Sequence, residues 1–134
     1  MLSSIGPGNL MTALAGELVA VFHAHPDDEV FATAAATHGL AAAGAQVQLF
    51  IATRGELPEQ SADPSLNEAS ARSARERRLD QSCQLLGVSR WSYLTRPGRW
   101  IDTTDRSRTL AAAPIPDVAA AIRSVIDDLR PQIV

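Results

Sequence analysis

Short, nearly continuous apolar segments alternate with longer segments of helical character along this chain. Continuous apolar runs are typical of strands that are buried on both faces of a parallel sheet. We expect strands at residues 18–23, 47–52 and 91–94, and the beginning of a fourth strand at residues 133–134. We expect helices at residues 28–43, 67–86 and 116–129. The last helix has the clearest apolar face, which consists of Val118, Ile122, Val125, Ile126 and Leu129.

This alternation predicts an α/β fold, a Rossmann-like three-layer sandwich with a mainly parallel sheet and right-handed crossovers. We interpret residues 1–16 as an N-terminal leader and residues 17–134 as one domain. Because the chain stops where the fourth strand begins, we expect the sheet to be incomplete at its C-terminal end. Ligands bind at the carboxyl ends of the strands in such folds, so the residues after the first two strands are candidates for a site.

Composition removes several classes of function. All twelve basic residues are arginine, which excludes a Schiff-base lysine and a Walker-type phosphate-binding lysine within these 134 residues. The net charge of −3 does not favour nucleic-acid binding. Cys83 is the single cysteine, so one chain forms no disulfide, and its helical context favours a small buried side chain. No apolar run reaches membrane-spanning length and no secretory signal is evident, so we expect a cytoplasmic protein.

The run His25-Pro26-Asp27-Asp28-Glu29 follows the first expected strand and carries the strongest chemical signal. Such a concentration of charge beside a core must be solvated, paired or bound to a cation. A turn at Pro26 would let His25 and Asp28 bind one ion, and their nitrogen and oxygen donors suit zinc, while iron or manganese would also accept them. A bound metal lowers the pKa of water, and Asp27 could then act as general base. Glu29 suits the first helical turn and could orient a ligand. The alternative is an ordinary acidic helix N-terminus after a proline turn.

Several motifs together resemble those of one family. Residues 24–29, Ala-His-Pro-Asp-Asp-Glu, resemble the motif of the zinc-dependent de-N-acetylases of the LmbE-like or PIG-L family, and residues 53–56 resemble that family's T-x-G loop. Arg75 and the Leu-Leu-Gly-Val ending at residues 85–88 resemble its arginine-bearing helix, and residues 130–134 resemble the approach to its next strand. The resemblance covers about residues 18–134, the N-terminal portion of such a protein.

This resemblance implies that His25 and Asp28 bind zinc, that Asp27 is the general base and that Arg75 contacts the substrate. The implied reaction is hydrolysis of the N-acetyl amide of an N-acetylglucosamine-type conjugate, a small-molecule substrate, with release of acetate and a free amine.

The chain also departs from the family pattern. Family members complete the zinc site with a histidine in a later H-P-D-H-like motif, which this sequence does not reach, and we expect neither His23 nor His38 to replace it. Arg78 stands where family helices commonly carry glutamate, and Arg-Pro-Gly at residues 96–98 stands where many members place an aspartate for sugar recognition. Asp102 is a candidate substitute for that aspartate, and the identity of the sugar conjugate stays open.

Two alternatives belong to other classes of protein. One is a catalytically incomplete domain that serves as a binding or oligomerisation module, with an unpaired sheet edge that pairs with a second copy. The other is a phosphoacceptor receiver domain, which also places acidic residues after its first strand. Receiver domains use a lysine after a later strand, and the absence of lysine argues against this class.

Overall fold

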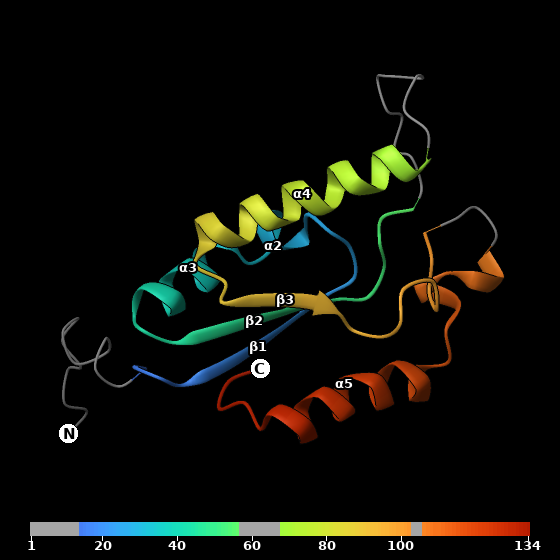
Figure 1. Ribbon diagram of the computed structural model, residues 1–134. Coiled ribbons are helices and arrows are strands. Elements are labelled where there is room, and N and C mark those ends of the chain that lie inside the picture. Colours follow the sequence, from blue (N-terminus) through green and yellow to red (C-terminus); the bar gives the residue numbers. More distant parts are fainter. Residues whose placement is uncertain (1–13, 57–67, 103–105) are drawn as a thin grey trace.

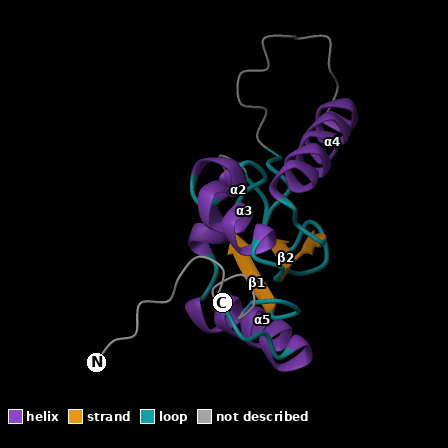
Figure 2. Cartoon of the chain, turned by 90° about the vertical axis from the view of Figure 1, so that its left-hand side faces the viewer, coloured by secondary structure: helices purple, strands orange, loops and turns teal. Residues whose placement is uncertain are grey.

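The computed structural model describes residues 14–56, 68–102 and 106–134. Three parallel strands, β1 (Leu18–His23), β2 (Gln46–Ile51) and β3 (Arg90–Tyr93), form a sheet in the order β1-β2-β3. Helices α2 (Asp28–Phe31), α3 (Ala34–Ala42) and α4 (Glu68–Leu86) cover one face, and α5 (Ile115–Leu129) covers the other (Figure 1). Two short 3-10 helices, η1 (Arg106–Arg108) and η2 (Leu110–Ala112), precede α5. The predicted α/β sandwich with a parallel sheet is confirmed, and Figure 2 shows its layers end-on.

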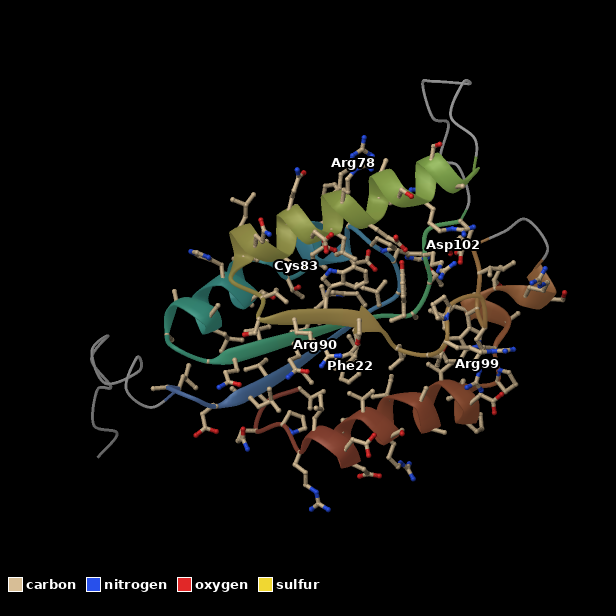
Figure 3. The ribbon with its side chains drawn as sticks, in the orientation of Figure 1. Phe22, Arg78, Cys83, Arg90, Arg99 and Asp102 are labelled. Carbon is tan, nitrogen blue, oxygen red and sulfur yellow. The ribbon has the colours of Figure 1, made fainter. Side chains whose placement is uncertain are left out.

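Strand β2 lies at the centre of the sheet and supplies much of the core. Val47, Leu49 and Ile51 are each at most 1% exposed, as expected for a strand with neighbours on both sides. Leu49 and Ile51 pack with Leu79 and Cys83 of α4. A second cluster contains Val19, Ala45 and Val47, and Leu14 packs against it. On the face toward α5, Phe22 stacks on Phe50 with ring centroids 5.3 Å apart (Figure 3).

The two long helices pack against opposite faces of the sheet (Figure 1). Leu79 and Cys83 of α4 are buried, and the five apolar residues predicted to form the inner face of α5 are all half-buried. None of the helices in the described parts of the chain is both long and apolar enough to cross a membrane.

The single helix predicted for residues 28–43 is wrong in one respect, because it divides into α2 and α3. Thr33 has a φ of −128° and a ψ of 7°, which interrupts the helix. The Thr33 hydroxyl bonds with the His23 ring, at a distance of 2.9 Å from Nε2, and accepts a hydrogen bond from the Thr37 hydroxyl. Threonine side chains compete for local hydrogen bonds in this way and favour helix ends over interiors. Helix α2 is therefore a separate short helix that directly follows the turn at residues 25–27.

The final residues form one isolated bridge beside β1, at the position where the sequence predicts the beginning of a fourth strand. Val19 and Ile133 form a parallel bridge, and the Ala20 amide donates to the Ile133 carbonyl over 3.0 Å. Consequently β1 lies between β2 and this last segment.

Candidate active site

The candidate site lies at the carboxyl ends of β1 and β2, where parallel α/β sheets bind their ligands. The two strand ends are joined there, because the Thr53 amide donates to the Ala24 carbonyl over 3.0 Å. A cavity of about 360 Å³ opens beside this junction. It is lined by His25, Pro26, Asp27, Asp28, Gly55, Arg75 and Asp102. All four residues predicted to bind metal or substrate or to act as base therefore line one cavity.

The turn that carries the acidic run holds Asp27 in an unusual backbone conformation. Asp27 has a φ of 118° and a ψ of −23°, in the left-handed region that favours glycine. Its amide donates to Glu29 Oε2 over 2.9 Å, and its carbonyl accepts the Val30 amide. Glu29 is only 2% exposed, and its other oxygen accepts a hydrogen bond from the Ser82 hydroxyl of α4. Glu29 therefore stabilises the turn that presents Asp27 to the cavity.

Two carboxylates flank the imidazole of His25. Nε2 lies 3.0 Å from Asp102 Oδ1, and Nδ1 lies 3.7 Å from Asp28 Oδ2. The same Asp28 oxygen accepts the His25 backbone amide over 2.9 Å. If Nε2 carries the proton and donates it to Asp102, the lone pair of Nδ1 is available on the side of Asp28.

Asp102 is a sequence-predicted candidate for sugar recognition, but its contact with His25 was not predicted. Its amide donates to Glu56 Oε2 over 3.0 Å, and its Oδ2 accepts the Thr53 hydroxyl over 2.9 Å. The loop after β2 thus holds the segment after β3 against the site. The available signal was Trp100, a large aromatic residue in a polar segment, which is 5% exposed and anchors the chain two residues before Asp102.

Arg75 reaches the cavity from α4 and lies beside Gly55 of the loop after β2. A Cβ atom built at Gly55 would lie 3.4 Å from Arg75 Cδ and 3.6 Å from Pro26 Cδ. Gly55 also has a φ of +65°. The distances are ordinary van der Waals contacts, so it is the positive φ that favours glycine at this position.

The remaining candidates lie apart from the cavity. His23 bonds to Thr33, and His38 is exposed on α3. Cys83 is buried beneath α4, as predicted. Burial raises the pKa of its thiol to about 12, with a further contribution from the charges of Glu29 and Asp80. Since the reactive form of cysteine is the thiolate, Cys83 is not a nucleophile near neutral pH.

The donors at this site fit two of the ligands that a catalytic metal needs. Two atoms bound to one zinc at about 2.05 Å in tetrahedral geometry are about 3.3 Å apart, close to the 3.7 Å between His25 Nδ1 and Asp28 Oδ2. Metal-binding histidines usually donate their other N–H to a carboxylate, and Asp102 is placed to accept it. The described residues include no group of three histidine, cysteine or acidic side chains arranged to hold a metal.

Comparison with solved structures supports the fold. An N,N'-diacetylchitobiose deacetylase from Pyrococcus horikoshii matches 87% of this chain and 39% of its own, with a TM-score of 0.66 and 21% identity. The 4-carboxy-2-hydroxymuconate hydratase of Pseudomonas putida matches 87% of this chain and 45% of its own, with a TM-score of 0.64 and 19% identity. The same architecture therefore supports different reactions, and the fold alone does not identify the chemistry.

Comparison of sequences is more specific. A 1D-myo-inositol 2-acetamido-2-deoxy-alpha-D-glucopyranoside deacetylase from Kineococcus radiotolerans is 38% identical over 84% of this chain and 36% of its own length. A protein of the same description from Nocardiopsis dassonvillei is 34% identical over 83% of this chain and 44% of its own length. The chain thus spans less than half of these relatives. Residues 20–134 match the PIG-L family model, described as GlcNAc-PI de-N-acetylase, and the chain belongs to this family.

Proposed function

We propose that this chain carries part of the active site of a metal-dependent hydrolase that removes the N-acetyl group from an N-acetylglucosamine-type conjugate. The observation that supports this most directly is the clustering of His25, Asp27 and Asp28 in one cavity at the end of β1. The named activities of the relatives support a substrate from the class of small-molecule amino-sugar conjugates.

His25, through Nδ1, and Asp28 would hold the metal. Their mixed nitrogen and oxygen donors favour Zn²⁺, and Fe²⁺ would also suit them. When bound, the metal polarises the acetyl carbonyl and lowers the pKa of water. The chain contributes the orientation of the ligands: Asp102 holds the Nε2–H of His25, and the His25 amide fixes the Asp28 carboxylate.

Asp27 would act as the general base. Its carboxylate accepts a proton from the water whose oxygen attacks the acetyl carbon, and the tetrahedral species then collapses with cleavage of the C–N bond. The proton passes to the departing amine, so that the products are acetate and the free amino sugar. The hydrogen bond from the Asp27 amide to Glu29 keeps this residue in position for the transfer.

Arg75 and Asp102 are the proposed substrate contacts. Asp102 already accepts hydrogen bonds from His25 and Thr53, and carboxylate oxygens have further lone pairs that a sugar hydroxyl could use. Arg75 supplies hydrogen-bond donors and positive charge to the same cavity.

The test measures zinc binding and acetate release in the 134-residue chain and in a version extended through a later histidine-containing motif. We expect the extension to strengthen both, since two protein ligands make a weak site. Asp27→Asn should retain zinc and lose acetate release, while His25→Ala and Asp28→Ala should lose both. The control is His38→Ala, which changes an exposed histidine on α3.

Two results would contradict the proposal. If Asp27→Asn releases acetate as fast as the unaltered protein, then Asp27 is not the base. If the extended protein binds zinc but releases no acetate from any N-acetylglucosamine conjugate, the alternative of a non-catalytic binding or oligomerisation module gains support, and gel filtration would then test for pairing between copies.

A further inference from the structure

A second groove adjoins the candidate active site and lies between α2 and α4. It encloses about 360 Å³ and shares Pro26, Asp27 and Arg75 with the active-site cavity. Because these residues line both cavities, the groove lies directly next to the cavity that contains His25. In Figure 2 the two helices stand side by side above the sheet, as this arrangement requires.

One wall of the groove is apolar and exposed. Val30 is 46% exposed and Phe31 is 84% exposed, although both belong to the four-residue helix α2 beside the site. Leu79 of α4 also lines the groove. An exposed phenylalanine is unremarkable by itself, but one that lines a groove next to the candidate site can cover an apolar part of a substrate.

The opposite wall is basic. Arg75 and Arg78 project from α4, and Figure 3 shows Arg78 rising from the side of the helix that faces away from the sheet. Glu29 also lines the groove, but it is buried, and both of its oxygens already accept hydrogen bonds from Asp27 and Ser82. Among the described residues, Arg78 has no carboxylate partner. Its positive charge is therefore available to a ligand at the rim.

We propose that this groove binds the part of the conjugate attached to the sugar, and that it selects an attached group that carries a negative charge next to apolar surface. The inference rests on the proposed function, because it assumes that an N-acetyl amino sugar occupies the adjoining cavity. The apolar portion would contact Phe31 and Val30, while Arg78, with Arg75, would face the anionic group. Guanidinium groups suit carboxylates and phosphates equally, so the shared property is the negative charge.

Three glycosides of N-acetylglucosamine test this proposal: the methyl, the phenyl and the 4-carboxyphenyl compound. Their dissociation constants for the full chain are measured by calorimetry. The carboxyphenyl glycoside should bind about threefold to fivefold more tightly than the phenyl glycoside, the size expected of one exposed ion pair. This preference should weaken at high salt. Phosphorylated phenyl glycosides then show whether phosphate serves as well as carboxylate.

Two variants assign the effect to the groove. Arg78→Gln should remove the preference for the carboxylate, whereas Arg77→Gln, an exposed arginine on the same helix that does not line the groove, should retain it. Phe31→Ser should weaken the binding of both aryl glycosides by a similar factor and leave the binding of the methyl glycoside unchanged.

The outcomes separate the groove from the reaction. Equal binding of the phenyl and carboxyphenyl glycosides, or a preference that survives in Arg78→Gln, overturns the inference, and so does a failure of all three to bind. If the charge preference follows Arg78 but the extended protein cleaves none of the three, the groove inference stands and the proposed function fails. If the extended protein cleaves all three glycosides but binds the phenyl and carboxyphenyl glycosides equally, the proposed function stands and the groove inference fails.

Discussion

The hydroxyl of Ser82 lies 2.5 Å from Oε1 of Glu29 and joins helix α4 to the turn that carries Asp27. Glu29 is almost completely buried, and its second oxygen accepts the Asp27 amide. A buried carboxylate without donors would be strongly unfavourable, so these two hydrogen bonds are what allow the acidic run to rest against the core. The arrangement makes the geometry of the proposed base depend on a serine 55 positions further along the chain.

Replacement of Ser82 by alanine should destabilise the protein, because Glu29 Oε1 then loses a hydrogen-bond donor in a buried setting. We expect the free energy of unfolding to fall by about 1–3 kcal/mol, which urea denaturation would measure. Ser73→Ala is the matched control, since Ser73 is exposed on the same helix, and its effect should stay within about 0.5 kcal/mol. Equal stability of the Ser82 and Ser73 variants would show that the hydrogen bond to Glu29 contributes nothing.

The backbone conformation of Asp27 should lower the free energy of unfolding relative to a protein with glycine at this position. A side chain at a φ of 118° is strained, whereas glycine adopts this conformation readily. Asp27→Gly should therefore be more stable to urea than Asp27→Ala by about 1 kcal/mol, although both lack the carboxylate and neither should release acetate. Comparing these two variants isolates the backbone from the side chain. If the alanine variant is as stable as the glycine variant, the turn is not strained.

Much of this fold was predictable because its signals are local. The buried strands appear as nearly continuous apolar runs, and helix α5 carries an apolar face with helical spacing. The interruption at Thr33 was missed, since the alanine-rich sequence after it favours a helix and the competing bond comes from His23, ten residues earlier. A contact of that kind depends on the placement of β1, and the periodicity of apolar residues does not predict it.

The candidate site was predictable to the extent that one short run of sequence supplies it. His25, Asp27, Asp28 and Glu29 are neighbours, and the strand before them fixes which edge of the sheet they occupy. Asp102 lies in an irregular segment, and its place beside His25 depends on Glu56 and Thr53 from a different loop. Hydrogen bonds between loops have no sequence period, so this part of the site required the structure.

The end of helix α4 packs closely against α3, and this contact should tolerate only glycine at position 87. A Cβ atom built there would lie 2.8 Å from Ala41 Cβ, and Gly87 has a φ of +77°. Gly87→Ala should cost about 1–3 kcal/mol of unfolding free energy through overpacking and backbone strain. Ala41→Gly in the same chain should recover part of this loss by removing the clash. The two single variants together predict a stability for the double variant. If the double variant is no more stable than this prediction, the clash is not the cause.

The buried thiol of Cys83 should make stability fall as the pH rises above about 9. Burial raises its pKa from 9.0 to about 12, so above pH 9 the unfolded chain loses this proton while the folded chain keeps it. The unfolded state then binds fewer protons, and its free energy falls relative to that of the folded state. The stability that the neutral thiol provides is complete below pH 9 and declines through the range up to about 12. Between pH 8 and pH 10 the decline should be about 1.4 kcal/mol.

Urea denaturation at pH 8, 9 and 10 measures this decline, with Cys83→Ala as the reference. The alanine variant should be less stable at every pH, because it leaves a cavity beside Leu49 and Leu79. Its stability should nevertheless vary less with pH over this range, since the thiol is the group whose ionisation is removed. Tyr93, whose pKa is also raised by burial and by its hydrogen bond to Glu76, is unchanged in the variant and contributes equally to both proteins. Parallel pH profiles for the two proteins would mean that the thiol ionises as readily in the folded chain as in the unfolded one.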